Sequence, residues 1–439
     1  MIRKIAGVSG LALGLAGCGA AATPGTPATA PGACCATTGS ACAMPTTAPA
    51  AVSPSGKAFG DDAAFAAKHT PIVELTDDTG EARVIVAPAL QGRVLTSTCS
   101  GQAGPAFGWI NKELLASGKL GPHINAFGGE DRFWVGPEGG QFSVYFAPGA
   151  AFDLQHWQTP APIDTEAYDV VSKDKGQVSL KHEFSLTNYS GTKLDVRVER
   201  QVKLLTPAEA WNALKVDAGA NVKLVAFESS NKLTNAGKEP WTRVTGLLSI
   251  WILGMFNASP DAVVLVPYKQ GPESEMGPMV QSGYFGDVPP ERLATVDGVV
   301  YFRADSHFRS KIGVSPARAK GVEGSYDSGK KVLTLVQYTL PQEKADYVNS
   351  QWKLQDNPFS GDVANAYNDG PNSLGSQMGQ FYEMESSSPA AELAPGQTIE
   401  HVQRTIHLTG DEAELNRIAQ AVLGVTLADI PKHLPAPSK

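Results

Sequence analysis

Along most of the chain, apolar residues alternate with polar ones in short runs. The clearest run spans residues 194–202, where Leu194, Val196, Val198 and Val202 are separated by polar side chains. A period of two is typical of a β-strand with one buried face and one face in water. Comparable strand-like runs occur at residues 82–86, 92–98, 177–186, 222–233, 261–267, 332–340 and 399–408. The pattern predicts a mainly antiparallel β protein.

Turn signals rich in Gly, Asn, Asp and Ser separate these runs, for example at residues 174–176, 188–191 and 327–329. Helical patterns are few and short, at residues 61–68, 111–117, 207–211 and 411–423. No fixed-period repeat is present, which argues against propellers and solenoids. Because no uncharged linker interrupts residues 61–430, one large antiparallel β-sandwich is the simplest interpretation.

The N-terminus has the features of a targeting segment. Arg3 and Lys4 precede an apolar run at residues 5–15, which is too short to cross a bilayer that requires about 20 residues. A signal peptide is the better interpretation. The run ends in Leu15-Ala16-Gly17-Cys18, which resembles the lipobox of bacterial lipoproteins. An ordinary cleaved signal followed by a chance cysteine is the alternative.

The lipobox resemblance implies that residues 1–17 are removed and that Cys18 carries the lipid, with acyl chains such as palmitate on its thiol and amine. Several acyl chains anchor a protein firmly in a membrane, whereas one alone binds marginally. Gly19, rather than Asp, follows the cysteine, which favours the outer membrane. We therefore expect a lipid-anchored protein of the cell envelope, facing the periplasm.

Residues 19–56 contain no Asp, Glu, Lys or Arg and no hydrophobic period, so residues 18–60 are predicted to be a flexible tether. Cys34 or Cys35 could form a disulfide with Cys42 in an oxidising envelope. A metal site at these cysteines is not expected, because no His or carboxylate lies nearby in the sequence to complete the ligand set. Cys99, in a strand-like run, is predicted to be a lone buried thiol. The expected division is a signal peptide at 1–17, the tether at 18–60, a β-supersandwich at 61–432 and a flexible tail at 433–439.

Composition excludes some classes of function. The 439 residues include 42% hydrophobic side chains, enough for a large core, and 36 basic against 44 acidic groups give a net charge of −8. Without a Lys/Arg-rich run, nucleic-acid binding is not expected. Hydrolase, phosphate-loop and dinucleotide signatures are absent, and the eight histidines do not fall at metal-ligand spacing. The sequence therefore indicates no cofactor and no metal.

Three polar and aromatic clusters remain as candidate chemistry. The first is a Gly-rich segment, residues 125–140, with Glu130, Arg132 and Trp134. An acid–arginine pair offers planar hydrogen-bonding groups and a tryptophan offers an apolar face, a combination that suits the hydroxyls and C–H faces of sugars. The alternative is a structural loop with an internal ion pair.

The second cluster comprises residues 346–352 and 361–371, in which amides, carboxylates and aromatic rings interleave with hardly a basic residue. Such a composition suits a neutral polyol better than a phosphate. The candidate ligand-binding residues here are Asn349, Trp352, Asn368 and Asp369. Residues 368–371 could equally form a plain turn.

The third cluster is residues 381–389. With a period of two, Phe381, Glu383 and Glu385 share one face of a strand. Two sheltered carboxylates on one face raise each other's pKa, which is one way to tune a general base. Two solvated acids on an edge strand are the alternative.

Together these features resemble the galactose mutarotase-like fold, the large β-supersandwich of aldose 1-epimerases and of sugar-binding domains in many glycosidases. The resemblance spans roughly residues 71–408. It is carried by residues 233–237 (Leu-Thr-Asn-Ala-Gly), Gly128-Gly129, the strand Met384-Glu385-Ser386 followed by Pro389, and the proline-bearing segment 388–397. The chain looks closest to an uncharacterised family of bacterial envelope lipoproteins within that superfamily.

In aldose 1-epimerases a late-strand Glu takes the proton of the anomeric hydroxyl and a His protonates the ring oxygen. The resemblance puts Glu385 at the position of that base, whereas Ala236 and Phe127 stand where the family has histidines. Arg132, His156 or His123 would have to supply the acid. Three functions stay open: a saccharide-binding envelope lipoprotein, an epimerase-like enzyme with Glu385 as base, or a purely structural envelope protein.

Overall fold

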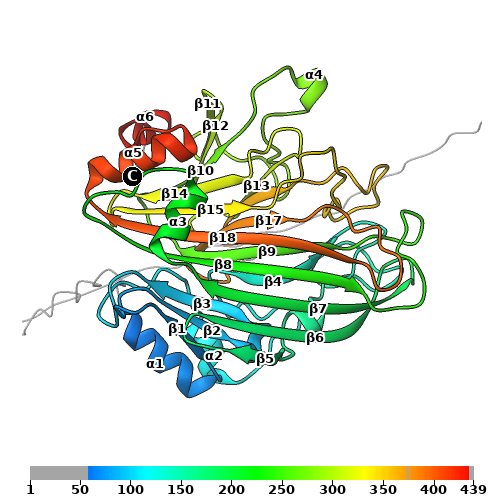
Figure 1. The fold of residues 1–439 in the computed structure, drawn as a ribbon. Coiled ribbons are helices and arrows are strands. Elements are labelled where there is room, and N and C mark those ends of the chain that lie inside the picture. Colours follow the sequence, from blue (N-terminus) through cyan, green and yellow to red (C-terminus); the bar gives the residue numbers. More distant parts are fainter. Residues whose placement is uncertain (1–57, 373–374, 435–439) are drawn as a thin grey trace, which may run out of the picture. The chain divides into compact units, whose positions relative to one another are not determined.

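The computed structural model describes residues 58–372 and 375–434, and in this part of the chain the strands form three antiparallel sheets (Figure 1). The smallest has the order β1-β2-β3 and consists of β1 (Val73–Thr76), β2 (Arg83–Ala87) and β3 (Arg93–Thr98).

The largest sheet has ten strands in the order β11-β12-β10-β14-β15-β18-β8-β7-β6-β5. Its long central strands are those with the clearest alternation in the sequence. In that order, the bounds are Leu293–Val296, Val299–Arg303, Ala262–Pro267, Val322–Asp327, Val332–Tyr338, Thr398–Gly410, Val222–Asn235, Lys193–Leu204, Gln177–Thr187 and Asp169–Lys173.

The third sheet has five strands in the order β13-β16-β17-β9-β4 and positions the candidate site. The strands are β13 (Ser310–Val314), β16 (Ala364–Asn368), β17 (Phe381–Ser387), β9 (Ser249–Asn257) and β4 (Arg132–Gly136). Side chains such as Tyr382 and Met384 on one face of β17 pack in a core with Val264 and Val336 of the ten-stranded sheet. The opposite face of β17 is therefore free to carry polar groups.

Short helices pack against the sheets. Helix α1 (Phe59–His69) lies against β3 and α2 (Lys112–Ser117), and α5 (Glu412–Leu423) contacts β10, β14 and β18. The remaining α-helices are α3 (Pro207–Leu214), α4 (Glu273–Met276) and α6 (Ile430–His433). Thr206 and Glu209 form a capping box at the start of α3, and Asp411 caps α5, which explains why these patterns begin where they do.

The predicted mainly antiparallel β-supersandwich with a few short helices is confirmed for the described residues. Each strand-like run predicted above corresponds to a strand, and Cys99 is a buried free thiol. The predictions for the signal peptide, for the tether cysteines and for residues 435–439 fall outside the described residues. No helix among the described residues is long and apolar enough to cross a membrane.

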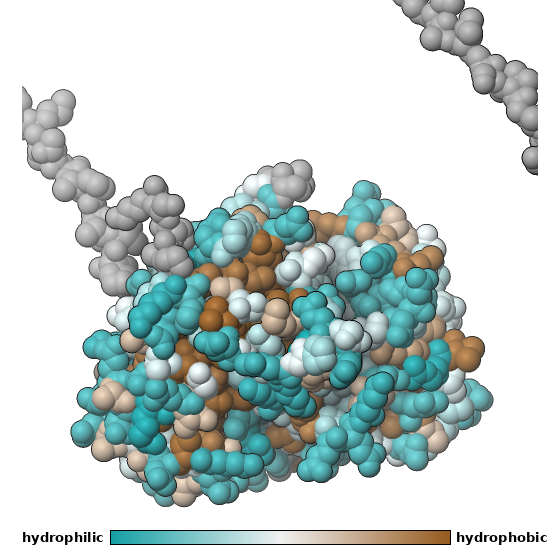
Figure 2. All heavy atoms as spheres, turned by 90° about the horizontal axis from the view of Figure 1, so that it is seen from above, coloured by the Kyte–Doolittle hydropathy of each residue, from teal (hydrophilic) through white to brown (hydrophobic). Residues whose placement is uncertain are grey.

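Close backbone contact fixes the loop that follows β4. A Cβ atom on Gly139 would lie 2.3 Å from the carbonyl oxygen of Gln351, so only glycine allows the two segments to cross here. Gly361 makes a similar contact, since its Cβ would lie 1.9 Å from the carbonyl oxygen of Val348. The first contact brings the first and second sequence clusters together, and the other joins the two parts of the second cluster. On the face shown in Figure 2, hydrophobic residues are visible in hollows between hydrophilic ones.

Candidate functional site

One face of the five-stranded sheet carries a row of polar side chains from neighbouring strands. Strand register places Asn365 beside Glu385, Glu385 beside Leu253, and Leu253 beside Arg132. Two residues further along the strands, Lys311 is beside Tyr367, and Tyr367 is beside Glu383. Because side chains alternate between faces with a period of two, these residues lie on the same face.

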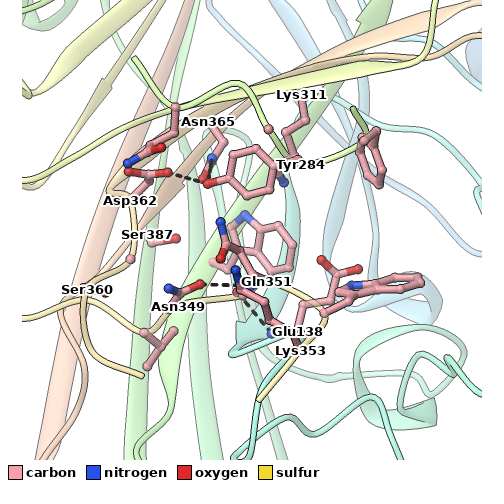
Figure 3. Close-up of a pocket in the computed structure, with 18 of the residues that line it drawn as sticks. Glu138, Tyr284, Lys311, Asn349, Gln351, Lys353, Ser360, Asp362, Asn365 and Ser387 are labelled. Carbon is pink, nitrogen blue, oxygen red and sulfur yellow. Dashed lines mark hydrogen bonds between the residues drawn. The ribbon is translucent and has the colours of Figure 1, made fainter. Parts of the chain in front are cut away.

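Two adjoining cavities lie over this face. The amide cavity, of about 510 Å³, is lined by polar residues that include Tyr284, Asn349, Gln351, Asp362 and Asn365 (Figure 3). The indole cavity, of about 290 Å³, is lined by residues that include Trp134, Trp157, Arg132, Asp369 and Glu383. Both are lined by Glu138, Leu154, Trp251, Phe285, Arg309, Lys311 and Trp352. We call the two together the double cavity.

Four of the chain's seven tryptophans form a continuous wall of the double cavity. The Trp157 and Trp352 rings stack with centroids 5.6 Å apart, and Trp134 meets Trp251 edge to face at 5.5 Å. The indole Nε1 atoms of Trp134 and Trp157 are buried and have no hydrogen-bond partner among the described residues. Each is a donor that a ligand oxygen could satisfy.

The floor of the indole cavity contains a buried ion pair. The Arg132 guanidinium donates to Glu383 Oε1 at 2.8 Å and lies 4.2 Å from the Trp134 ring centroid. Two other nitrogens of the Arg132 guanidinium, Nε and Nη1, have no hydrogen-bond partner among the described residues. Burial raises the pKa of the Glu383 carboxyl above its usual range, although the positive charge of Arg132 acts in the opposite direction.

A second buried pair joins β13 to β17. Lys311 Nζ lies 2.8 Å from Glu385 Oε2 and 3.1 Å from Oε1, and Trp251 Nε1 donates to Oε2 at 2.9 Å. Burial alone would lower the pKa of Lys311, but nearby carboxylates, chiefly Glu385, outweigh it and raise that pKa. Glu385 is fully buried and is not among the residues that line either cavity. In this structure its carboxylate is the partner of Lys311 and Trp251.

Two other carboxyl groups face the amide cavity from opposite sides (Figure 3). Burial raises the pKa of Glu138 to about 7, an effect that the positive charge of Lys311 reduces. Burial likewise raises the pKa of Asp362 to about 6, although its hydrogen bond from the Tyr284 hydroxyl acts to lower it. These groups can exchange protons near neutral pH.

Seven of the residues singled out from the sequence line the double cavity: His123, Arg132, Trp134, Asn349, Trp352, Asp369 and Glu383. The three sequence clusters therefore meet on one side of the five-stranded sheet. Asp369 is held in place, since its carboxylate accepts hydrogen bonds from the Tyr367 hydroxyl at 2.7 Å and from the Gly379 amide at 2.8 Å.

Three other candidates lie outside the double cavity. Glu130 is buried between sheets and bonds Ser97 and His407, the latter at 2.9 Å. Asn368 points to the opposite face of β16 from Tyr367, and its amide binds the Ser306 amide and the Phe308 carbonyl. His156 is exposed and pairs with Asp153 at 2.7 Å. Their contacts are those of structural residues, because partners within the chain already use their polar groups.

Sequence reasoning did not single out Glu138, Trp157, Trp251, Asp362, Tyr284, Arg309 and Lys311 as site residues. Glu138 and Asp362 lie in the quoted clusters, so their acidity was a usable signal. Trp251 lies in a buried, largely apolar strand. Arg309 immediately precedes the short strand β13, and Lys311 is the second residue of that strand, which contains no recognisable motif. Only the strand register brings them to the site. Among the described residues, no group of three or more His, Cys, Asp or Glu could hold a metal ion.

Fold and site together define a β-supersandwich protein with a polar, tryptophan-walled double cavity. Residues 57–434 match the family described as "Family of unknown function (DUF6786)", and the chain belongs to this family. None of the curated proteins matches the chain.

Several solved structures are similar to this chain. A putative aldose 1-epimerase from Escherichia coli K12 is 13% identical, with a TM-score of 0.46, over 78% of this chain and 99% of that one. A galactose mutarotase-like protein from Lactobacillus casei ATCC 334 is 9% identical, with a TM-score of 0.42, over 77% and 100%. A putative mutarotase from Salmonella typhimurium is 11% identical, with a TM-score of 0.41, over 80% and 99%. These proteins are of the kind that the sequence motifs resemble, and at this level of similarity they carry no argument about ligand or chemistry.

The raised pKa of Glu138 predicts a pH-dependent effect of Glu138→Gln on stability. Because the folded-state pKa of about 7 exceeds the ordinary value of 4.5, the folded state binds more protons between these values. The stability contribution of Glu138 is therefore present at low pH and is lost as pH rises through 7. Relative to wild type, Glu138→Gln should gain about 2 kcal/mol in the free energy of unfolding between pH 5 and pH 8.

Denaturant unfolding at pH 5, 6, 7 and 8 measures this difference. Glu183→Gln, which changes an exposed Glu on β6, is the matched control and should shift the curve equally at each pH. A difference between Glu138→Gln and wild type that does not change with pH would show that the Glu138 carboxyl is not desolvated.

Proposed function

We propose that the double cavity binds a saccharide. Three buried hydrogen-bond donors beside the tryptophan wall have no partner among the described residues, and they are the main support for the proposal: Trp134 Nε1, Trp157 Nε1 and Arg132 Nη1. A buried donor without a partner costs about 1–3 kcal/mol, so a folded protein keeps such groups where a ligand or water satisfies them. Sugar hydroxyls are suitable acceptors for all three.

The lining of the double cavity supports the same class of ligand. The tryptophan rings offer apolar faces for the C–H faces of a sugar ring, while Asn349, Asn365 and Gln351 offer amides for its hydroxyls. The amide cavity, at about 510 Å³, is in the range of small-molecule sites, roughly 300–1,000 Å³, and the indole cavity, at about 290 Å³, is at its lower end. The ion pairs Arg132–Glu383 and Lys311–Glu385 hold the floor of the cavities in one geometry.

We further propose that the protein acts at the cell envelope, anchored through lipid on Cys18. The lipobox-like sequence at residues 15–18, which follows a basic and apolar signal-like segment, supports this proposal. In this view the supersandwich presents its cavities to saccharides on the periplasmic side of the outer membrane.

A second candidate function is epimerase-like catalysis, which the position of Glu138 favours. Opening an aldose ring requires a base to take the proton of the anomeric hydroxyl while the ring oxygen gains a proton, and closing the ring reverses both transfers. Asp362, with the lower pKa, is the ionised group suited to the first transfer, and Glu138 on the opposite wall, with the higher pKa, is suited to the second. Glu385, the base that the family resemblance implies, would instead position Lys311.

Replacing Trp352 tests the binding proposal. Trp352 lines both cavities, so Trp352→Ala should weaken saccharide binding about tenfold or more because the stacking surface is lost. Isothermal titration of the folded protein against a panel of aldoses and disaccharides measures the effect. Trp211→Ala on α3, outside both cavities, is the control and should bind as wild type does. If wild type binds none of the sugars, the binding proposal is wrong and a structural envelope role is favoured.

Replacing Glu138 tests the catalytic candidate. If Glu138 is the acid, Glu138→Gln should slow anomer exchange by about 10²- to 10⁴-fold while sugar binding persists. Exchange spectroscopy by NMR at pH 7.5 on the bound aldose measures the rate, with Glu183→Gln as the control. Wild-type exchange equal to that in buffer would leave a binding protein only, and unchanged exchange in Glu138→Gln would exclude Glu138 as the acid.

Replacing Cys18 tests the anchor. Cys18→Ala should move the protein from the membrane fraction to the soluble fraction and abolish incorporation of labelled palmitate, because the acceptor thiol is gone. Cys99→Ala, which removes a buried thiol of the folded domain, is the matched control and should stay with the membrane. Equal membrane association of wild type and Cys18→Ala would contradict the lipid anchor.

A further inference from the structure

Arg309 differs from the other arginine and lysine side chains that line the double cavity. It lies immediately before β13 and lines both cavities. Arg132 is paired with Glu383, Lys311 is paired with Glu385, and Lys353 is exposed and lines the amide cavity alone. Among the described residues, no carboxylate lies within 4.0 Å of the Arg309 guanidinium.

The Arg309 side chain is nevertheless held in position. Its Nε donates to the Tyr367 hydroxyl at 3.1 Å, and that hydroxyl donates in turn to Asp369 Oδ1 at 2.7 Å. The guanidinium also lies 4.0 Å from the centroid of the Phe285 ring. Nε is the only Arg309 side-chain nitrogen with a hydrogen-bond partner among the described residues, so both terminal nitrogens are available.

Glu138 does not serve as the missing partner of Arg309. It lines both cavities, but burial is the main influence on its pKa, and Arg309 is the weakest of the influences on it. A direct Arg–carboxylate contact would instead lower the carboxyl pKa strongly. The positive charge of Arg309 therefore faces the cavity without compensation from a neighbouring acid.

We propose that Arg309 forms an anion subsite, and that the ligand of the double cavity is a saccharide with an anionic substituent, namely a carboxylate, a sulfate or a phosphate. This inference rests on the proposed saccharide-binding function and names the class of its ligand. The two terminal nitrogens of a guanidinium match the oxygens of such groups in a bidentate arrangement. Arg309 Nε is bonded to the Tyr367 hydroxyl, which is bonded to Asp369, and the guanidinium packs on the Phe285 ring. These contacts fix the plane of the guanidinium before a ligand binds.

The inference changes the ligand expected from the sequence. The second sequence cluster, with hardly a basic residue, favours a neutral polyol. Arg309 and Lys311 come from a strand outside all three clusters, and they add positive charge to the wall that the two cavities share. Lys311 is neutralised by Glu385, and Lys353 is exposed and lines the amide cavity alone, so Arg309, which lines both cavities, carries the discrimination.

Matched sugar pairs test the inference by isothermal titration of the wild-type protein. The probes are galacturonate, galactose 6-sulfate and glucose 6-phosphate, each against its neutral parent sugar. At least one anionic sugar should bind at least tenfold more tightly than its parent at low salt, and the preference should shrink as salt is raised. The three anions separate the carboxylate, sulfate and phosphate sources of the same chemistry.

Arg309 variants locate the preference. Arg309→Gln should weaken binding of the preferred anionic sugar by about 10- to 100-fold and change binding of its neutral parent by less than about threefold. Arg309→Lys keeps the positive charge but loses the planar guanidinium, so its affinity for the anionic sugar should lie between those of wild type and Arg309→Gln. Arg243→Gln is the matched control, since Arg243 is also stacked on an aromatic ring, Phe359, but is paired with Asp346 outside the double cavity. Thermal unfolding of each variant confirms that it is folded.

The outcomes separate this inference from the proposed function. If neutral sugars bind as tightly as anionic ones, or if Arg309→Gln weakens both equally, the anion subsite is wrong and saccharide binding stands. If no sugar of either kind binds, both proposals are wrong. A preference for anionic sugars that survives in Arg309→Gln would assign the charge recognition to another residue and overturn the role of Arg309.

Discussion

The site depends on one constraint, namely that a charge buried in a β-sheet must have a partner. Desolvation of an unpaired ion costs more than most proteins can tolerate, so buried charges occur as pairs. On the five-stranded sheet, Lys311 pairs with Glu385, and Arg132 pairs with Glu383. Breaking one of these pairs leaves an uncompensated buried charge at a cost of about 3–5 kcal/mol. The pairs therefore fix the floor of both cavities before any ligand is bound.

The same constraint separates structural polar groups from those available to a ligand. Groups that are already satisfied, such as Glu385 between Lys311 and Trp251, maintain geometry. Groups without partners, such as the indole nitrogens of Trp134 and Trp157, are where a ligand gains most, because its oxygens replace no existing bond. Since both kinds occur around the double cavity, it combines a rigid base with unsatisfied walls, as preorganised binding requires.

The sequence predicted most of the long strands but only some of the residues that line the double cavity. Long strands with one wet face, such as 194–202, are predictable because alternation reports burial directly. Strand β9 is buried on both faces and shows no alternation, so Trp251 could not be assigned to the site. Lys311 and Arg309 became visible only through the pairing of β13 with β16, a register that the local sequence does not encode.

The family resemblance is a better guide to fold than to chemistry, and the positions of its histidines show why. Phe127 is buried in the core formed by α1, α2 and β3, and Ala236 is exposed just after β8, so neither lines the double cavity. Even a histidine restored at these positions would therefore act elsewhere in this structure. The side chains that line the double cavity and can transfer a proton are others, among them Glu138, Asp362 and Glu383, whose carboxyl pKa values burial raises, and His123. If the double cavity binds a saccharide as proposed, a catalytic role and a binding role would share its walls and differ in the protonation of these side chains.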